Sequence, residues 1–367
     1  MTIKCLLHYA PGEEDRCHFP AAEEKIDYLL SCVQRAGHEA QILSACRTEE
    51  GRSSRGGVKQ LRPGITLELL PCSGGNKWET FLFYCRLTRR LLQFVSDGDT
   101  LWAYHALPLM VPLRIVRRLR RIRLILETEE LYGDVLGKNW IRRRELAFFK
   151  TADGFLVPSR ELGRLISAGD RPRVICHGAY VPAQAREKER NGTVHVVYAG
   201  SADPGKGAFP AMEAAAFLPE NFHVHILGTK TPEIRKVLNR VKPRCMLTHH
   251  GSLDHGACRA FLRSCHIGLC TQNPEAAFSE SAFPSKILTY LSCGLEVVCT
   301  PIAAVRGSEV GGMLHYSESS DPEAVARAVL RAAKETGSRG SARLLQLDQS
   351  FLPLWKTLLE MDGKTDG

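Results

Sequence analysis

The stretch "FPSKILTYLSCGLEVVCT" (283–300) is the part of the sequence that decides the fold. Pro284 suits a first helical turn, because its missing N–H leaves no donor unpaired there. Aliphatic residues then recur at helical spacing, and Gly294 is a favourable residue just past a last turn. The residues "LEVVCT" (295–300) have the pattern of a buried strand. The stretch therefore predicts a short helix that leads directly into a sheet.

An anion site is predicted at the beginning of this helix. Ser285 and Lys286 lie there, where free N–H groups and the positive end of the helix dipole favour a negative charge. A second stretch, "VVYAGSADPGKG" (196–207), has the pattern of a strand and a turn that opens another helix; an ordinary loop is the alternative. Gly200 permits a phosphate to approach the backbone, and Lys206 adds a positive charge. Together the two lysines predict a pyrophosphate site, where they would also neutralise a leaving group.

The whole chain alternates short apolar runs with helical stretches. This alternation predicts an α/β protein whose parallel sheets carry helices on both faces. A polar segment, "YVPAQAREKERNG" (180–192), separates two such series and predicts a linker. We therefore expect two doubly wound Rossmann-like domains that face each other across a ligand cleft. Their expected ranges are 1–179 and 193–345, and a final helix in 346–367 is expected to cross back to the first domain.

Positive charge is concentrated in the first half of the chain. Of a net charge of +9, residues 1–180 supply most, with 28 lysines and arginines against 21 aspartates and glutamates. A basic surface favours acidic partners. The run "RIVRRLRRIR" (114–123) is the densest part, and it is interpreted as a solvated helix face, a peripheral membrane contact or a nucleic-acid contact. Because it lacks interleaved aromatic residues, we do not expect nucleic acid as a partner.

The location of the protein and its need for a metal are predicted from sequence patterns that are absent: a membrane-spanning run, a signal peptide and a C-x-x-C pair. No apolar run reaches the roughly 18 residues of a spanning helix, and the first residues lack a signal-peptide pattern. We expect a cytoplasmic protein, with peripheral contact at the inner membrane face as an option. The 13 cysteines include no C-x-x-C pair, which argues against a zinc ribbon and against a redox pair. No metal site is expected.

The second half resembles the donor-binding domain of GT-B glycosyltransferases of the family 4 type. The residues that carry the resemblance are "YAGSADPGKG", "GSLDHGACRAFLRSCHIGLCTQN" and "SAFPSKILTYLSCGLEVVCT". The resemblance implies sugar transfer from a UDP- or GDP-sugar, with retention of configuration and without a required metal or other cofactor. It makes Lys206 and Lys286 catalytic, as neutralisers of the departing diphosphate. It also implies substrate binding by Gly200, Ser201, Gly228, Leu253, Glu280, Phe283, Pro284, Ser285 and Thr289.

The sequence departs from the family pattern at the donor site. Ser201 stands where members commonly carry an arginine. Ser281 and Thr289 occupy the positions of two glutamates, and Glu280 lies one place away as a substitute for the first of them. Since the second glutamate usually binds the donor ribose, this departure leaves the identity of the donor open.

Three candidates for the acceptor side lie in the first half. His105 ends the strand "TLWAYH" (100–105) and is predicted to be catalytic, close to the acceptor or the donor sugar; the alternative is a histidine that caps the next helix. Glu129 follows a central strand within "ETEELY" and is expected to orient an acceptor hydroxyl. Gly12 suits a tight turn under the donor sugar, with a plain loop as the alternative.

The sequence thus predicts a retaining glycosyltransferase whose acceptor is a lipid-linked saccharide or a small metabolite. Two alternatives remain from the sequence alone. One is a non-catalytic nucleotide-sugar binder, which the missing glutamates favour. The other is a membrane-docking protein with a degenerate cleft, which the basic run favours.

Overall fold

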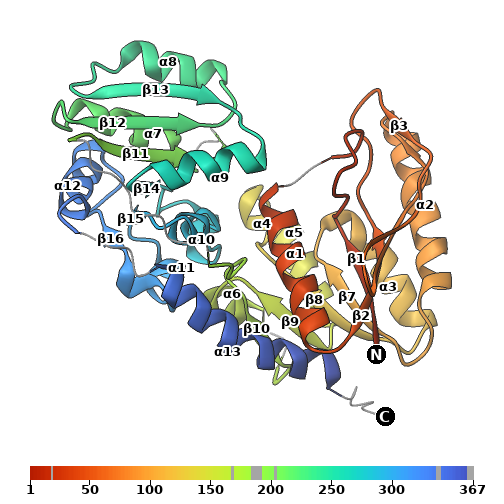
Figure 1. The fold of residues 1–367 in the computed structure, drawn as a ribbon. Helices are drawn as coiled ribbons and strands as arrows, with labels where there is room; N and C mark the ends of the chain where they lie inside the picture. Colours follow the sequence, from red (N-terminus) through yellow and green to blue (C-terminus); the bar gives the residue numbers. More distant parts are fainter. Residues whose placement is uncertain (18–19, 167–168, 183–191, 202–204, 336–339, 362–367) are drawn as a thin grey trace. The chain divides into compact units, whose positions relative to one another are not determined.

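The computed structural model describes residues 1–17, 20–166, 169–182, 192–201, 205–335 and 340–361. The chain divides into two compact units (Figure 1). Unit 1 contains residues 1–158, 162–179 and the C-terminal residues from Ser350 onwards. Unit 2 contains residues 159–161 and 180–349. The predicted linker falls largely on 183–191, which lie outside the described residues.

Unit 1 is built on a sheet that is parallel except at one edge. Within the described residues its eight strands lie in the order β10-β9-β8-β7-β1-β2-β5-β4. Their bounds are β1 (Thr2–Leu7), β2 (Glu39–Ser44), β4 (Gly57–Arg62), β5 (Ile65–Leu69), β7 (Thr100–Tyr104), β8 (Arg123–Glu127), β9 (Gly154–Val157) and β10 (Arg173–Ile175). Strand β4 pairs antiparallel with β5 and was missed from the sequence, although Pro63-Gly64 between them is a turn signal. A small antiparallel pair, β3 (Ser53–Ser54) and β6 (Cys72–Ser73), lies beside the sheet.

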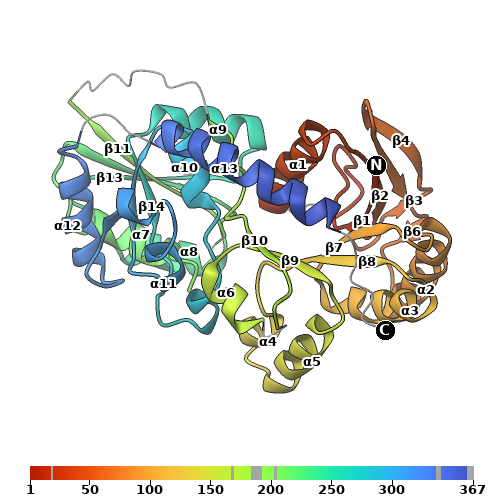
Figure 2. The ribbon, with the colours of Figure 1, turned by 90° about the horizontal axis from the view of Figure 1, so that it is seen from below.

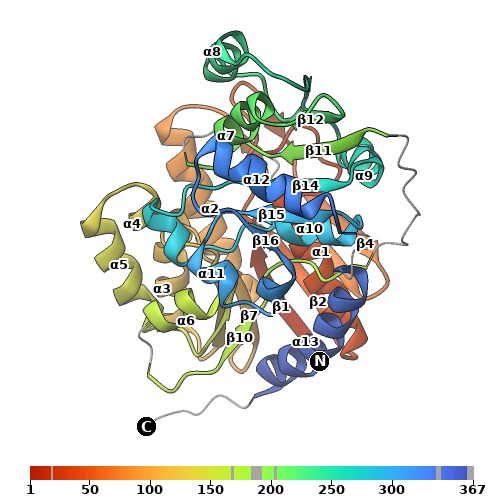
Figure 3. The ribbon, with the colours of Figure 1, turned by 90° about the vertical axis from the view of Figure 1, so that its left-hand side faces the viewer.

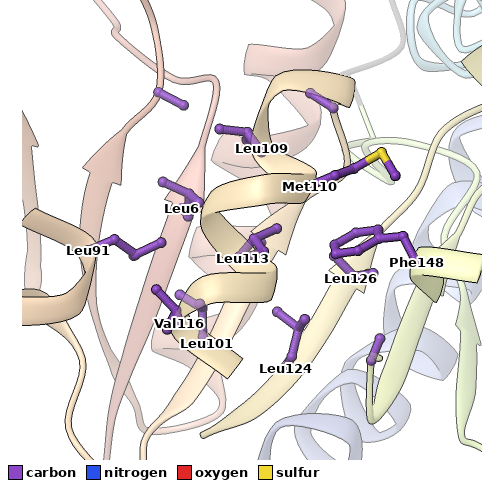
Figure 4. Close-up of a cluster of buried hydrophobic side chains, with 14 of the residues drawn as sticks. Leu6, Leu91, Leu101, Leu109, Met110, Leu113, Val116, Leu124, Leu126 and Phe148 are labelled. Carbon is purple, nitrogen blue, oxygen red and sulfur yellow. The ribbon is translucent and has the colours of Figure 1, made fainter. Parts of the chain in front are cut away.

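Helices cover both faces of this sheet. On one face, α2 (Lys77–Phe94) and α3 (Met110–Leu119) bury a cluster of leucines and phenylalanines, joined by Phe148 of α5 (Asn139–Phe149) (Figure 4). On the other face lie α1 (Pro20–Arg35) and the end of α13 (Gly340–Glu360), whose Phe351 contacts Tyr28. The short helices α4 (Tyr132–Val135) and α6 (Arg160–Leu165) follow β8 and β9. The two-sided covering expected from the alternating pattern is confirmed.

Helix α13 passes from one unit to the other. Its residues up to Gln349 belong to unit 2, and those from Ser350 belong to unit 1. In unit 1, Trp355 packs edge-on against Trp102 of β7 with ring centroids 5.4 Å apart. Burial of two tryptophans accounts for the docking of this helix, because aromatic pairs contribute about 0.5–1.5 kcal/mol beyond the area they bury. The sequence placed the beginning of this crossing segment at residue 346.

Unit 2 is built on an all-parallel sheet. Within the described residues its six strands lie in the order β13-β12-β11-β14-β15-β16. The bounds are β11 (Val194–Ala199), β12 (Phe222–Leu227), β13 (Met246–Gly251), β14 (Ile267–Cys270), β15 (Glu296–Cys299) and β16 (His315–Tyr316). This strand order reverses its direction between β11 and β14, and in doubly wound sheets ligands bind beside such a point at the carboxyl ends of the strands.

The helices of unit 2 are also divided between two faces. The helices α7 (Ala208–Glu213), α8 (Pro232–Arg240) and α12 (Pro322–Ala332) bury one apolar cluster against the sheet (Figure 3). On the opposite face lie α9 (His255–Ser264) and α10 (Lys286–Ser292) (Figure 2). The short helix α11 (Ala303–Arg306) follows β15. Helix α10 and strand β15 are the elements predicted from residues 283–300, and Gly294 between them has φ +74°.

Candidate functional site

Three neighbouring strands of unit 2 end in glycines. Gly200 follows β11, Gly228 follows β12 and Gly251 ends β13, with φ of 150°, 144° and 78°. The Gly200 N–H donates to Leu227 O (3.1 Å), and the Gly228 N–H donates to Gly251 O (2.9 Å). A Cβ on Gly228 would lie 2.2 Å from Gly200 O, which no side chain tolerates. The backbone edge here therefore carries no side chains and is closely packed at Gly228, with open space beside Gly251.

Lys286 reaches this edge from the beginning of α10. Its ammonium lies 3.8 Å from the centre of the Tyr198 ring, and a Cβ on Gly200 would lie 2.7 Å from Lys286 Nζ. Burial lowers the pKa of Lys286 to about 8, and the groups that oppose this shift are the thiols of Cys270 and Cys299 rather than a carboxylate. Among the residues that the structure describes, no carboxylate pairs with this ammonium, and a cation in such a place is suited to receive an anion from outside.

Lys206 belongs to the loop that begins at Gly200. The Tyr198 hydroxyl donates to the carbonyls of Ser201 and Lys206, at 2.9 Å each, so that one tyrosine holds both ends of this loop and also carries Lys286 on its ring. The Lys206 ammonium lies 4.5 Å from the centre of the Phe278 ring. Gly207, with φ +98°, is bound through its carbonyl by the Thr271 hydroxyl (2.5 Å). Both predicted lysines therefore contact the same group of loops.

The segment before α10 supplies the other predicted donor residues. Phe283 is buried, whereas Pro284, Ser285 and Thr289 are half-buried. Glu280 is exposed at the end of a 3-10 helix (Ala277–Glu280). Ser281, at a family glutamate position, is buried, and its carbonyl accepts a hydrogen bond from the Ser159 hydroxyl.

The helix that begins at Lys286 is too short to form an anion site at its N-terminus. Helix α10 has seven residues, and Ser285 makes no capping hydrogen bond with its side chain. A dipole of two turns adds little to an anion site. The predicted anion site therefore depends on the lysine and the glycine edge rather than on the helix end, and it stays a prediction.

The remaining predicted residues of unit 2 lie in exposed loops. Leu253 follows β13 and is 37% exposed. Ser201, in place of the family arginine, is exposed as well. Sequence reasoning missed Tyr198, Thr271 and Phe278, which shape the lysine loop. Tyr198 lies two residues before Gly200, and its position at the end of a strand was the signal available for it.

His105 in unit 1 is a buried residue. Its Nε2 lies 2.8 Å from Glu145 Oε1, and both side chains are fully buried. Glu145 also accepts hydrogen bonds from the backbone N–H groups of Tyr132 (2.9 Å) and Gly133 (2.7 Å). In this unit the His105 ring therefore faces Glu145 in the interior and does not point toward a ligand as predicted. The ring instead fixes the carboxylate that joins α4 and α5.

Glu129 in unit 1 belongs to a buried charge group. Lys25 of α1 forms ion pairs with Glu129 and, at 3.6 Å, with Glu127. Glu127 also accepts from the indole N–H of Trp102 (3.0 Å), and burial raises the pKa of Glu127 to about 7. Glu129 keeps 28% of its side chain exposed. Gly12, with φ +72°, lies in a turn after β1, as its sequence context predicted.

The basic run 114–123 is only partly available to a partner. Arg117 pairs with Asp153 (2.8 Å), and Arg114 lies over the Phe148 ring. Arg118 and Arg121 are exposed. Leu119, the last residue of α3, is 63% exposed. In the described parts of the chain, no helix combines the length and the apolar character needed to cross a bilayer.

Comparison with known proteins supports the sequence resemblance. Residues 193–335 match the family model described as Glycosyl transferases group 1. No curated protein matches the sequence significantly. The matched region comprises most of unit 2, which contains both lysines.

Solved structures similar to this one extend over nearly the entire chain. One from E. coli is described as trehalose-6-phosphate bound with UDP-2-fluoro glucose (TM-score 0.69, 12% identity, 98% of this chain and 99% of that chain). Another is an α,α-trehalose-phosphate synthase (UDP-forming) from Burkholderia xenovorans with glucose-6-phosphate (TM-score 0.67, 13% identity, 97% and 98%). A third comes from work on glycosyltransfer with retention by trehalose-6-phosphate synthase (TM-score 0.66, 13% identity, 96% and 97%).

These likenesses settle the fold of the chain. It is the GT-B fold of nucleotide-sugar-dependent transferases, as the sequence predicted. The resemblance to GT-B glycosyltransferases is confirmed, whereas the family 4 type stays a prediction.

Proposed function

We propose that the chain is a retaining glycosyltransferase that transfers a sugar from a UDP-sugar to a hydroxyl of a small acceptor. The observation that carries this proposal is the position of Lys286, whose ammonium lies against Gly200 and Tyr198 and pairs with no carboxylate of the described residues. The diphosphate of a nucleotide sugar supplies the missing negative charge. The match of residues 193–335 to a glycosyltransferase family supports the same conclusion.

The reaction breaks the bond between the sugar C1 and the diphosphate oxygen and forms a bond from C1 to the acceptor oxygen. The electron pair of the broken bond stays on the diphosphate, where Lys286 and Lys206 stabilise the added charge. The acceptor proton passes to the departing phosphate oxygen on the same face of the sugar. This route needs no protein base, which agrees with the buried, Glu145-bound state of His105. In this proposal His105 is a positioning residue.

The other donor contacts follow from the residues around Lys286. Thr289 lies one turn after Lys286 on α10, so that the two side chains share a helix face. We assign its hydroxyl to the donor in place of the family glutamate. Gly200 and Gly228 provide backbone at close range, and exposed Ser201, Leu253 and Glu280 complete the predicted contacts.

A UDP-sugar and a sugar-phosphate acceptor are the first substrates to test. Two of the similar structures are described with UDP-2-fluoro glucose and with glucose-6-phosphate bound. A lipid-linked saccharide and other small metabolites form the second set of acceptors, and GDP-sugars form the second set of donors.

The experiment combines turnover with binding. The full chain is incubated with radiolabelled UDP- and GDP-sugars and an acceptor panel, and products are separated by chromatography. We expect transfer or slow donor hydrolysis, and a rise in the unfolding temperature with UDP that Lys286→Met abolishes. Lys236→Met, which removes an exposed lysine of α8, is the matched control. Binding without any turnover would establish a nucleotide-sugar binder instead, and no binding of any nucleotide would refute the proposal.

We also propose a peripheral membrane contact through residues 114–123. Exposed Leu119, Arg118 and Arg121 at the end of α3 support it, since an apolar side chain flanked by arginines suits an anionic lipid surface. Flotation with anionic vesicles tests this contact. We expect the double variant Arg118→Glu/Arg121→Glu to lose flotation, and equal flotation of the variant and wild type would refute the contact.

A further inference from the structure

A group of histidines lies across the sheet of unit 2, away from the lysine site. His195 is on β11, His223 and His225 are on β12, and His250 is on β13, three strands that lie side by side (Figure 1). On β12 the alternating residues face the apolar cluster under α7, so that the histidines point to the opposite face. There Phe261 of α9 packs edge-on against His225, with ring centroids 5.1 Å apart.

The rings form a connected set. His195 Nδ1 lies 2.9 Å from His225 Nε2, and His225 Nδ1 lies 3.0 Å from His250 Nε2. One ring nitrogen from each of His195, His223 and His225 lies within 4.8 Å of the other two. His225 is buried, and the other two of these rings are half-buried.

Two of the rings are disfavoured as cations. Burial, followed by the neighbouring histidines, lowers the pKa of His225 to about 3 and lowers the pKa of His223. A neutral imidazole has one protonated and one unprotonated nitrogen, and the unprotonated nitrogen is the metal ligand. The convergence of one nitrogen from each of His195, His223 and His225 therefore offers three imidazole ligands to one ion.

We propose that His195, His223 and His225 bind one Zn²⁺ or a similar borderline divalent ion, with water as the fourth ligand. Imidazole nitrogen suits Zn²⁺, Ni²⁺ and Cu²⁺. The ion takes the place of the hydrogen between His195 Nδ1 and His225 Nε2, and the ring that donated it carries its proton on its other nitrogen instead, so that both imidazoles stay neutral. For Zn–N bonds of about 2.0–2.1 Å at tetrahedral angles, the two nitrogens must separate to about 3.3 Å, a small adjustment from 2.9 Å.

His250 has a supporting part in this site. When His225 Nε2 binds the ion, its Nδ1–H donates to His250 Nε2, the bond that the structure already contains. Metal-bound histidines usually donate their second N–H in this manner, which fixes the ring and raises its basicity. The structure therefore contains both a metal ligand, His225, and the hydrogen-bond partner that orients it, His250.

The proposed metal site is separate from the proposed donor site. His195 precedes Gly200 by five residues, about 16 Å along an extended strand. We therefore expect the ion to stabilise unit 2, by linking β11 to β12, without taking part in transfer. Removal of metal by a chelator should lower the unfolding temperature and leave donor binding intact.

The experiment uses the full chain, treated with EDTA and dialysed. Calorimetric titration with Zn²⁺ is expected to give one site per chain. His223→Asn and His195→Asn should each weaken binding by at least about 100-fold, and His250→Asn by about 10-fold. His315→Asn, which removes an imidazole from β16 in the same sheet, should have no effect. Circular dichroism and thermal unfolding in metal-free buffer verify that each variant folds. His195 and His223 are half-buried and His250 is exposed, so none of the three substitutions removes a fully buried side chain.

A Co²⁺ spectrum separates imidazole from thiolate binding. The proposal predicts tetrahedral d–d bands without the charge-transfer bands of a cobalt–thiolate bond. Thiolate bands, absence of Zn²⁺ binding, or one-site binding that survives in the folded His223→Asn variant would each overturn it.

Discussion

Two lysines, one in each unit, have opposite electrostatic surroundings: Lys25 is buried beside two carboxylates, and Lys286 is half-buried. Burial alone lowers the pKa of Lys25, but Glu129 and Glu127 outweigh that effect and raise it. Lys286 has no such partner among the described residues, and burial lowers its pKa to about 8. A cation with its own carboxylates serves the fold, whereas one without them is available to a ligand. The difference separates the structural charge group of unit 1 from the candidate site of unit 2.

Loss of the paired lysine should have the largest effect on stability. Lys25→Met leaves Glu127 and Glu129 together without a cation, and breaking a buried pair costs about 3–5 kcal/mol. We expect a decrease in the free energy of unfolding at the lower end of that range, measured by urea denaturation at pH 8. Glu127→Gln in the same background should restore part of the loss, because it removes a buried negative charge. An equal decrease in the free energy of unfolding for Lys286→Met would contradict the proposed difference between the two lysines.

Loss of the unpaired lysine should instead affect turnover. Lys286→Met removes a group that stabilises the leaving diphosphate, and such a loss typically reduces kcat by about 10²–10³-fold. Steady-state kinetics with the preferred donor measure the effect, and urea denaturation should show equal or greater stability than wild type. A variant with unchanged kcat would exclude Lys286 from the leaving-group site.

The glycine edge should tolerate no side chain. Gly228→Ala places a Cβ 2.2 Å from Gly200 O at φ +144°, so that the backbone must shift. Strain of this kind costs about 1–3 kcal/mol, and we expect a lower unfolding free energy together with weaker UDP binding. Gly312→Ala is the matched control, since its Cβ would meet nothing within 4 Å. Equal stability of the two variants would mean that the edge is not closely packed.

The smallest effect expected is a pH dependence of donor affinity. Above pH 8 Lys286 loses its proton in the free protein, so UDP affinity should fall by about tenfold between pH 8 and pH 9.5, and Lys286→Met should be insensitive. Folding stability should change with pH in the opposite direction to UDP affinity. Between pH 8 and 10.5 the unfolded chain holds the proton that folded Lys286 has lost, so this group makes the ligand-free protein more stable as pH rises. Calorimetry and urea denaturation across this range measure both trends.

The sequence predicted the fold better than it predicted the site. The parallel strands, the helices on both faces and the elements of 283–300 follow from local patterns, because period and glycine placement act within a few residues. The antiparallel strand β4 was missed, since its six residues are mainly polar, none is buried, and they show no clear period. The predicted role of His105 depended on the direction of one side chain, and this depends on Glu145, forty residues away.

The sequence by itself determined the succession of strands and helices along the chain, the positions of the glycine turns, and the two lysines of the candidate site, Lys206 and Lys286. What only the tertiary structure decided is the partner of each charge: Lys25 with two carboxylates, Lys286 with none in the described part of the chain, His105 with Glu145, and the histidines of three strands with one another. The physical reason is that burial and pairing depend on residues brought together across a sheet, whose separation along the chain leaves no local pattern.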